Sequence, residues 1–347
     1  MDEKNKQKFG VRGEISMDKD AIVKINSEYH HIGGEDLVKN KDKVYIEYRK
    51  RWNDWPKTFH LGDFPLFIDI ESTNSCNLMC PFCSRTAHPE KFKTSFISFD
   101  MVKKIIDEGR ENNLYGVKFS ITGEPMMHKE IHKFVKYAKD SGLADVYFNT
   151  NATLLTRDKA KKLIEAKLDR LSISFEGYTK EVYESYRVGS RFETVIENIK
   201  NLQSLKQELG VVHPKIRVQT VLLPELLPDL KKYKTFWKGV VDEIGFLDYQ
   251  PRVEEKDKIL VGDWACPQLW QRLGILANGT IIPCNHDEDA ICSLGNIKNT
   301  TIKEVWNSTK LNSMRKKHQH GNAHEIGSCK YCYLRASEIN KLKEENK

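Results

Sequence analysis

The segment Leu66-Phe67-Ile68-Asp69-Ile70 is closely followed by Cys76-Asn77-Leu78-Met79-Cys80-Pro81-Phe82-Cys83. The first segment is short, apolar and rich in β-branched side chains, which predicts a buried strand. The second segment predicts a loop that carries three cysteines in the spacing C-x3-C-x2-C. We therefore expect a cluster of thiols at the end of the first strand of a sheet.

Strand-like and helix-like segments alternate after this loop. Helical spacing of apolar residues extends over 99–112, 128–138, 157–166, 192–209 and 226–236. Strand candidates lie between these helices, at 117–121, 146–149, 170–175, 216–222 and 244–249. Because parallel strands need crossover helices, the repeat predicts an α/β fold with a parallel sheet, either open and doubly wound or a (β/α) barrel. In both architectures the loops after the strands form the site.

The composition of the 347 residues suits a large folded protein, because 39% are apolar. The net charge of +7 is spread along the chain without a basic stripe, so we expect no nucleic-acid partner. The first residues, MDEKNKQKFG, lack the apolar core of a signal peptide, and no apolar stretch is long enough to cross a bilayer. We expect a soluble cytoplasmic protein with no membrane contact.

Eight cysteines fall into two groups separated by a long cysteine-free stretch. The first group is Cys76, Cys80 and Cys83, and the second is Cys266, Cys284, Cys292, Cys329 and Cys332. A reducing cytoplasm disfavours disulfides, so metal binding or catalysis is the expected use of these thiols.

Three thiolates on one short loop can hold three irons of a [4Fe–4S] cluster and leave the fourth iron open to another ligand. Zinc is the alternative. It prefers a closed set of four ligands, and no fourth cysteine or nearby histidine completes this loop, which disfavours zinc here.

The C-x3-C-x2-C loop, with an aromatic residue before its last cysteine, resembles that of the radical SAM enzymes. The resemblance implies a partial (β/α)6 barrel in which the three cysteines hold a [4Fe–4S] cluster and S-adenosylmethionine (SAM) binds the open iron. It implies that Phe82 contacts the adenine of SAM. It further implies a 5'-deoxyadenosyl radical that abstracts a hydrogen atom, and an electron donor such as flavodoxin or ferredoxin.

Three further motifs at predicted strand ends resemble those of the same family. Thr122-Gly123-Glu124-Pro125 is similar to its G-G-E-P, which implies that Gly123 and Glu124 hold the amino group of SAM. Asn149-Thr150-Asn151 is similar to its T-N-G region, with Ala152 in place of glycine, and Asn149 is a candidate SAM contact. Ser174-Phe175-Glu176-Gly177 is similar to its S-x-D-G, and Ser174 and Arg187 would bind the SAM carboxylate.

In the second cysteine group, Cys266 and Cys284 flank a hairpin predicted by Asn278-Gly279, and Cys329-x2-Cys332 follows. Two separated pairs of thiolates suit either zinc or an iron–sulfur cluster. The whole stretch, including its G-N-I and E-V-W-N-S segments, resembles the twitch and SPASM domains appended to radical SAM barrels. That resemblance implies an auxiliary [4Fe–4S] cluster with every iron ligated, hence two clusters in the chain.

The predicted organisation has four parts. They are an N-terminal extension at 1–62 with a possible hairpin at Gly33-Gly34, a partial barrel at 63–255, an auxiliary-cluster domain at 256–336 and a charged tail at 337–347. A single helix is predicted over 302–315 in the auxiliary domain.

A fully ligated cluster suits electron transfer, so the resemblance implies oxidation of a small, carbohydrate-like substrate. The chain is similar to aminocyclitol dehydrogenases and to sugar epimerases. Glu176 and Arg252, together with Asp248 and His286, are candidates for orienting substrate hydroxyls or accepting a proton, or else they are solvated loop charges. Cys292 is either a small buried apolar side chain or the thiol that returns a hydrogen atom in an epimerase. A peptide-modifying maturase and a zinc-binding interaction protein remain alternatives.

Overall fold

The structure is a computed structural model that describes residues 30–32, 43–222, 230–248 and 264–345. In these ranges ten strands form one curved sheet in the order β1-β7-β6-β5-β4-β3-β2-β8-β9-β10. The strands are β1 (His30–Ile32), β2 (Phe67–Ile70), β3 (Gly116–Lys118), β4 (Asp145–Thr150), β5 (Arg170–Ser174), β6 (Lys215–Leu222), β7 (Glu243–Asp248), β8 (Arg272–Ile275), β9 (Thr280–Ile282) and β10 (Gly295–Asn296).

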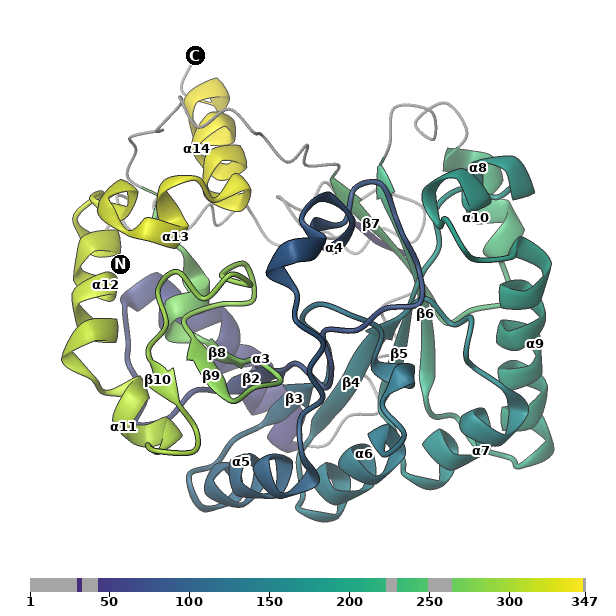
Figure 1. Cartoon of the computed structure of the whole chain (residues 1–347), viewed down its shortest axis with the longest axis horizontal. Coiled ribbons are helices and arrows are strands. Elements are labelled where there is room, and N and C mark those ends of the chain that lie inside the picture. The colour runs from purple at the N-terminus through teal and green to yellow at the C-terminus, as the bar shows by residue number, and fades with distance from the viewer. Residues whose placement is uncertain (1–29, 33–42, 223–229, 249–263, 346–347) are drawn as a thin grey trace.

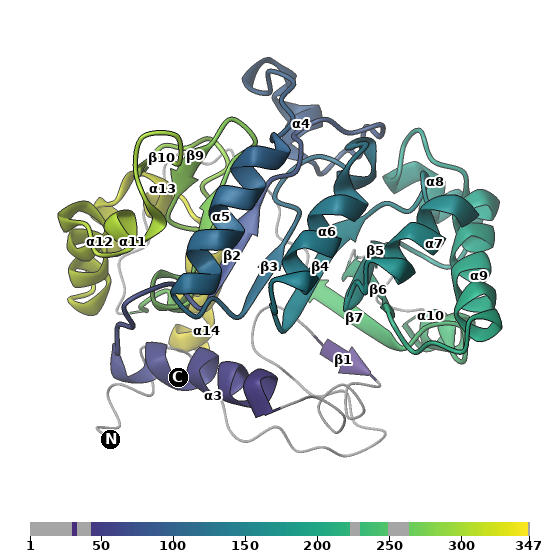
Figure 2. The same ribbon diagram turned by 90° about the horizontal axis from the view of Figure 1, so that it is seen from below.

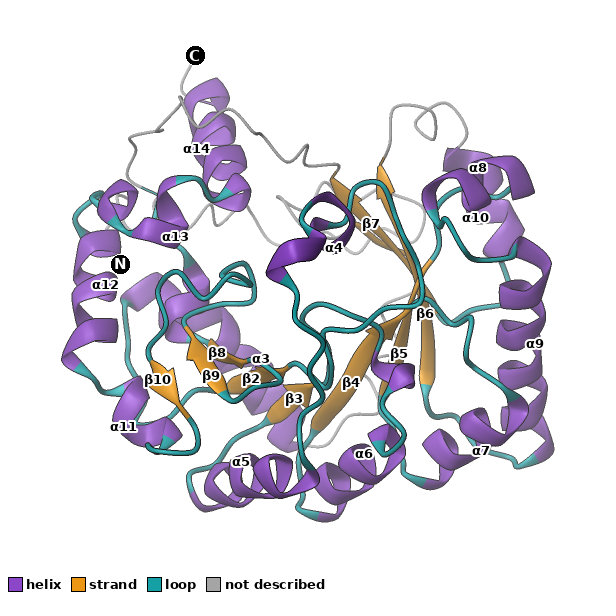
Figure 3. Cartoon of the chain, in the orientation of Figure 1, coloured by secondary structure: helices purple, strands orange, loops and turns teal. Residues whose placement is uncertain are grey.

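The strands from β7 through β2 to β8 run parallel, whereas β1, β9 and β10 pair antiparallel at the two edges. The helices of the barrel are α4 (Ser84–Ala87), α5 (Phe99–Glu111), α6 (Ile131–Asp140), α7 (Arg157–Glu165), α8 (Lys180–Tyr186), α9 (Phe192–Glu208) and α10 (Leu230–Trp237). Most of them lie along the outer side of the curved sheet (Figures 1 and 3). Six strands, β2 to β7, linked by outer helices confirm the predicted partial (β/α)6 barrel.

Successive side chains along each strand point to opposite faces of the sheet, and one of these faces is apolar and the other polar. Ile68 and Ile70 pack with the outer helices in the main core, whereas the intervening Asp69 faces the other side of the sheet. Lys118 and Arg217 are also buried there, on β3 and β6. The inside of the barrel is therefore lined by buried charged groups.

Helix α3 (Lys43–Thr58) covers the end of the barrel where the strands begin. Tyr48 is 1% exposed and stacks on Tyr115 and Phe67, with ring centroids 5.4 and 6.4 Å away. Figure 2 shows α3 and α4 at opposite ends of the strands. The predicted extension at 1–62 included no helix, although aromatic residues at helical spacing, Tyr45, Tyr48, Trp52 and Trp55, signal one. The predicted hairpin at Gly33-Gly34 lies outside the described residues.

The C-terminal region continues the same sheet. The β8–β9 hairpin predicted at Asn278-Gly279 is present, and Gly279 takes a positive φ of 91°. Because β8 pairs with β2, the sheet extends across the boundary predicted between 255 and 256. The remaining helices are α11 (Ile302–Trp306), α12 (Thr309–Gln319), α13 (Gly327–Lys330) and α14 (Tyr333–Glu345).

One expectation for this region was wrong in detail. The single helix predicted over 302–315 is two helices, because Ser308 caps α12 by accepting the Leu311 N–H at 3.3 Å. The charged tail from residue 337, predicted to be helical or frayed, belongs to helix α14 up to residue 345, and its Ile339 is 2% exposed and packs with Trp264 and Leu334. Among the described residues, no helix is long and apolar enough to cross a membrane.

Candidate active site

The first cysteine loop lies at the carboxyl end of β2 and leads into α4. Cys80 is buried, and Cys76 and Cys83 are half-buried. The loop is fixed by backbone hydrogen bonds, from the Cys83 N–H to the Cys80 carbonyl at 3.0 Å and from the Met79 N–H to the Val188 carbonyl at 2.9 Å. Burial raises the pKa of Cys76 and of Cys80, and the neighbouring thiols of the loop raise it further. The thiols of this loop therefore lie close enough together for a charge on one to raise the pKa of another.

Gly123 supports this loop from the end of β3. Its φ is +56°, and a side chain at this position would collide with the carbonyls of Thr73 and Ser75, the latter 2.7 Å from a Cβ. The next residue, Glu124, donates its backbone N–H to the Ser75 carbonyl at 2.7 Å. A glycine is thus required where the two strand-end loops cross.

Glu124 joins the ends of β3 and β4. One carboxylate oxygen accepts the Met126 N–H at 3.0 Å and the Thr150 hydroxyl at 2.7 Å, and the other accepts the Asn151 N–H at 2.7 Å. Burial raises the pKa of Glu124, and these hydrogen bonds oppose the shift. The carboxylate was expected to hold SAM, and here it also organises the loops around the site.

The two asparagines at the end of β4, Asn149 and Asn151, have different contacts. The backbone N–H of Asn149 donates to the Ser120 hydroxyl at 3.0 Å, which fixes the end of β4. The side chain of Asn151 donates to the Asn77 side-chain oxygen at 3.0 Å, next to Cys76. Sequence reasoning chose Asn149, whereas the structure also brings Asn151 to the cysteine loop.

Arg187, Glu176 and Phe82 converge on Cys80. The Arg187 guanidinium donates to both oxygens of Glu176, with Nη2 2.7 Å from Oε1, and its Nη1 lies 3.6 Å from the Cys80 sulfur. The same guanidinium lies over the Phe82 ring, 5.4 Å from its centroid. Ser174 is the last residue of β5, two positions before Glu176.

The Glu176–Arg187 ion pair differs from the roles that the sequence predicted for the two residues. Glu176 was expected to orient substrate hydroxyls or accept a proton, and Arg187 was expected to bind the SAM carboxylate. Both oxygens of Glu176 accept Arg187 N–H groups, and the Glu176 side chain is 1% exposed. A carboxylate held in this way is poorly suited to accept a substrate proton. Sequence alone could not find the pair, because many acidic and basic residues lie equally close along the chain.

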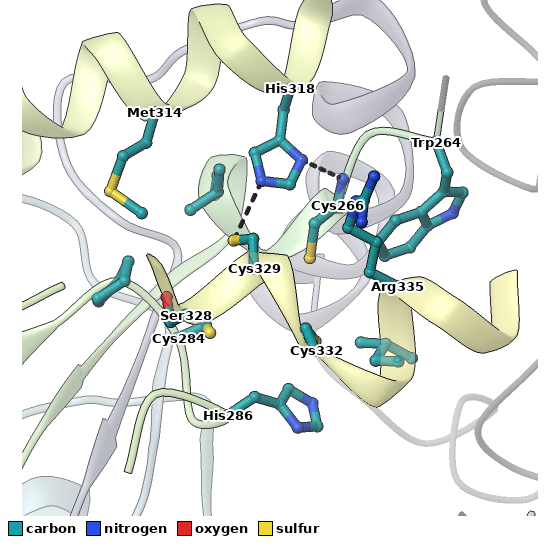
Figure 4. A pocket seen from close by; sticks show the side chains of 13 residues that line it. Trp264, Cys266, Cys284, His286, Met314, His318, Ser328, Cys329, Cys332 and Arg335 are labelled. Carbon is teal, nitrogen blue, oxygen red and sulfur yellow. Dashed lines mark hydrogen bonds between the residues drawn. The ribbon is translucent and has the colours of Figure 1, made fainter. Parts of the chain in front are cut away.

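Four cysteines of the second group line one cavity beside α12, α13 and α14: Cys266, Cys284, Cys329 and Cys332 (Figure 4). Burial raises the pKa of Cys266 and Cys284 well above the usual value, and the other thiols of the set raise it further. Burial likewise raises the pKa of Cys329 to about 12. Buried thiolates so close together need compensating positive charge, which bound metal supplies.

The donor set fits an iron–sulfur cluster. In the ranges given above, no three or more His, Cys, Asp or Glu side chains are arranged around a single metal ion. Four sulfur donors around one cavity match a cubane, in which each thiolate binds its own iron. In the first loop, three sulfur donors fit a cluster with one open iron.

His318 lies in the wall of the second site and is 0% exposed. Burial lowers the pKa of its ring to about 3, so the ring is neutral. Its Nδ1 accepts the backbone N–H of Cys266 at 3.2 Å, and its Nε2 lies 3.4 Å from the Cys329 sulfur. Sequence reasoning did not select this residue.

Cys292 lies next to the second site but does not line its cavity. Its sulfur accepts the Ser328 N–H at 3.4 Å, and its own N–H donates to the Asp287 carboxylate at 3.0 Å. The side chain is half-buried and packs against the main core. Arg252 lies outside the described residues.

A buried ion cluster inside the barrel was not predicted. Asp69 is 0% exposed and contacts Lys118 at 2.9 Å and Arg272 at 3.2 Å. Although burial opposes ionisation, these two cations lower the pKa of Asp69. His286 belongs to the same surroundings, because burial and the charges of Arg272 and Lys118 lower its pKa to about 4. Asp69, a charged residue inside the apolar segment 66–70, is the feature of the sequence from which this buried ion cluster could have been predicted.

Glu71 connects the barrel to the C-terminal hairpin. It accepts a hydrogen bond from the Thr122 hydroxyl, and its other oxygen accepts the Ala277 N–H at 3.0 Å. The departure from glycine at position 122 therefore has a structural use, since the threonine hydroxyl binds this buried carboxylate.

Comparisons with known proteins agree with this arrangement. Residues 70–234 match the radical SAM superfamily, and residues 266–333 match the SPASM iron–sulfur cluster-binding domain. The AdoMet-dependent heme synthase of Oleidesulfovibrio alaskensis is 32% identical over 165 residues, which are 47% of this chain and 40% of that protein. The PqqA peptide cyclase of Bradyrhizobium diazoefficiens is 37% identical over 115 residues, which are 33% of this chain and 29% of that protein. The GTP 3',8-cyclase of Limosilactobacillus fermentum is 28% identical over 188 residues, which are 53% of this chain and 54% of that protein. The chain thus matches less than two thirds of the length of each relative.

Solved structures share the fold at low sequence identity. BtrN in complex with AdoMet and 2-DOIA has a TM-score of 0.53 at 18% identity, covering 78% of this chain and 93% of BtrN. SuiB of Streptococcus suis has a TM-score of 0.57 at 15% identity, covering 84% of this chain and 78% of SuiB. AnSMEcpe with bound AdoMet has a TM-score of 0.59 at 15% identity, covering 81% of this chain and 98% of that chain.

The two matched regions coincide with the two cysteine groups and imply SAM and [4Fe–4S] clusters as cofactors. The chain is therefore built from a radical SAM domain followed by a SPASM domain.

Proposed function

We propose that the protein is a radical SAM oxidoreductase that acts on a small, polar, carbohydrate-like molecule such as a sugar, a nucleotide sugar or an aminocyclitol. In this proposal the first cysteine group holds one [4Fe–4S] cluster with SAM, the second holds another, and a flavodoxin or ferredoxin supplies electrons. When loaded, the first site would supply a radical that takes a hydrogen atom from the substrate. The substrate radical would then release a proton to solvent and pass the remaining electron to the second site.

The observation that carries the proposal is that four thiols line the same cavity of the SPASM domain. Four protein ligands complete a cubane and leave no iron for a substrate. Electron transfer is the use that remains for such a cluster. An electron acceptor in the same chain as a radical-generating site favours net oxidation.

The residues around the first cysteine loop support a binding site for SAM. Gly123 allows the two loops to cross closely, and Glu124 fixes the ends of β3 and β4.

The Arg187 guanidinium lies next to Cys80, where it can donate hydrogen bonds to a carboxylate. Glu176 orients Arg187 by a two-point ion pair, and we assign it as a positioning residue rather than a base. Ser174, Asn149 and Phe82 complete the proposed SAM contacts.

The inside of the barrel supports a polar substrate. Lys118, Arg272, Arg217 and Asp69 are all buried or nearly so on its inner face. Charged groups of this kind hydrogen-bond hydroxyl, carboxylate or phosphate groups and disfavour an apolar ligand.

Product analysis tests the reaction type. With the right substrate, each turnover should yield one 5'-deoxyadenosine and a product that has lost two hydrogens. A product with the same formula as the substrate, which carries one deuterium at an inverted carbon when the reaction is run in deuterated water, would mean epimerisation instead. Loss of that product in Cys292→Ala, with 5'-deoxyadenosine still formed, would then assign Cys292 as the hydrogen donor.

Iron analysis tests the cofactors. Anaerobically reconstituted protein should contain about eight irons per chain, because two cubanes contain four each. Cys80→Ala should abolish 5'-deoxyadenosine formation, whereas Cys329→Ala should remove about four irons. About four irons together with one zinc would contradict the auxiliary cluster.

A second candidate is modification of a peptide. It is supported by the match to a PqqA peptide cyclase, and by the fold shared with SuiB bound to its precursor peptide SuiA and with anSMEcpe bound to a peptide. Substrate-dependent formation of 5'-deoxyadenosine with a peptide, but not with sugars or aminocyclitols, would favour this candidate.

A further inference from the structure

We propose that His318 is a positioning residue of the second cysteine group, which orients the Cys329 thiolate and raises the reduction potential of the cluster bound there. The inference rests on the proposed function, because it requires an iron–sulfur cluster on these cysteines. It extends that function by giving a role to a side chain outside the set of iron ligands.

The contacts of His318 connect two separate parts of the cysteine group. The side chain comes from α12 and is completely buried. Its ring accepts the backbone N–H of Cys266 on one edge, and its other nitrogen faces the Cys329 sulfur (Figure 4). Cys266 and Cys329 are 63 positions apart in the chain, so the histidine holds together segments that only the fold makes neighbours.

The contact with Cys266 fixes the direction of the second hydrogen bond. A backbone amide can only donate, so Nδ1 of His318 carries no proton. An imidazole without a proton on Nδ1 is neutral and carries its one hydrogen on Nε2. The Nε2–H therefore donates to the Cys329 sulfur, at the 3.4 Å separation of the two atoms.

A hydrogen bond to a ligating sulfur favours the reduced cluster. Reduction adds one electron and breaks no bond, so the negative charge on the sulfurs increases. An N–H donor stabilises this extra charge, and hydrogen bonds to the sulfurs are among the features that set cluster potentials. The effect is strengthened by burial. Arg335, 2% exposed, acts in the same direction, because it places a positive charge in the wall of the same cavity.

Two substitutions separate the effects of the hydrogen bonds made by the two ring nitrogens of His318. His318→Asn keeps an acceptor at the position of Nδ1 and removes the donor to Cys329. His318→Gln places an amide N–H at the position of Nε2 and removes the acceptor for Cys266. Each full-length protein is reconstituted anaerobically, analysed for iron and titrated potentiometrically with detection by electron paramagnetic resonance. The Cys329→Ala protein identifies the signal of the second site, since that signal is absent from it.

We expect His318→Asn to keep its iron and to lower the potential of the second site by about a tenfold change in the reduction equilibrium, or about 59 mV. His318→Gln should recover most of this loss. Met314→Leu is the control, because Met314 lines the same cavity from the same helix and makes no hydrogen bond that the substitution would remove.

An unchanged potential in His318→Asn, with iron retained, would overturn the assignment. Equal loss of iron from both histidine variants would also overturn it, because His318 would then be needed only to build the site. Wild-type protein that holds zinc at the second site would refute the proposed function itself, and this result is seen before any substitution is made.

Discussion

Gly123 illustrates how one residue controls the first cysteine loop. Gly123→Ala must place a methyl group against the Thr73 and Ser75 carbonyls in a backbone conformation with φ of +56°. Gly142→Ala is a matched control, since Gly142 also has a positive φ but has nothing within 4 Å of a Cβ. We expect Gly142→Ala to cost about 1–2 kcal/mol of unfolding free energy. Gly123→Ala should cost clearly more and also lose iron from the first site. An equal loss of unfolding free energy in Gly123→Ala and Gly142→Ala, measured by urea denaturation, would contradict the need for close contact between the loops that follow β2 and β3.

The Glu176–Arg187 pair is the second residue-scale feature that can be tested. The two side chains are 1% and 13% exposed, so removing either charge leaves the other buried without its partner. Glu176→Gln should therefore cost about 3–5 kcal/mol of unfolding free energy. It should also weaken SAM binding in calorimetry, because Arg187 loses its orientation.

The exposed Lys180–Glu193 pair, 3.0 Å apart, provides the comparison. Glu193→Gln should cost far less unfolding free energy than Glu176→Gln, since water screens an exposed ion pair. Normal SAM affinity in Glu176→Gln would contradict the positioning role of Glu176.

At the scale of elements, Glu108 of α5 caps the first turn of α11. Its two carboxylate oxygens accept the Ile302 and Lys303 N–H groups at 3.0 and 2.9 Å. Glu108→Ala should lower the unfolding free energy by about 1–2 kcal/mol, because it removes a charged helix cap. Glu111→Ala, an exposed acid at the end of the same helix, should have almost no effect on the denaturation midpoint. An equal effect of the two substitutions would show that the contact between α5 and α11 adds no stability.

A second element-scale prediction concerns His128, between β3 and α6. The ring is 7% exposed, with its Nε2 2.9 Å from the Ile97 carbonyl, and its Nδ1 accepts the Glu130 N–H at 3.1 Å. Burial lowers the pKa of this ring. The unfolded chain therefore binds a proton near pH 6.5 while the folded protein resists it, so stability falls as pH drops below about 6.5.

His128→Gln should reduce the loss of unfolding free energy between pH 8 and pH 5, measured by urea denaturation at each pH. His320→Gln, at an exposed position, is the control. An unchanged pH dependence in His128→Gln would show that other groups cause the acid sensitivity.

At the scale of the whole molecule, the radical SAM and SPASM domains share a sheet and a buried ion cluster. Asp69 on β2 binds Lys118 on β3 and Arg272 on β8. Asp69→Asn leaves two buried cations without their carboxylate and should cost about 3–5 kcal/mol of unfolding free energy. Both domains should still unfold in one transition, with tryptophan fluorescence and cysteine labelling giving the same midpoint.

Asp140→Asn tests the specificity of this effect, because Asp140 forms an exposed pair with Lys136. It should leave the midpoint nearly unchanged. Two separate transitions in the wild type would show that the shared sheet does not couple the domains.

The sequence by itself determined the features that depend on local order. The alternation of apolar segments predicted an α/β fold with a parallel sheet, since periodicity follows directly from helix and strand geometry. The resemblance of the cysteine loop to that of the radical SAM enzymes implied that this sheet forms a partial barrel. The spacing of Cys76, Cys80 and Cys83 marked one loop, and Asn278-Gly279 marked a hairpin, because both signals lie within a few residues of chain.

Only the tertiary structure decided which distant groups become partners. Arg272 contacts Asp69 across 203 positions, and His318 contacts the backbone of Cys266 across 52. Glu176 and Arg187 were both selected from sequence, yet their ion pair and its approach to Cys80 emerged only from the fold. The physical reason is that a charged or polar side chain has many possible partners along the chain. Packing of the sheet and helices brings one of them within hydrogen-bond distance and buries both.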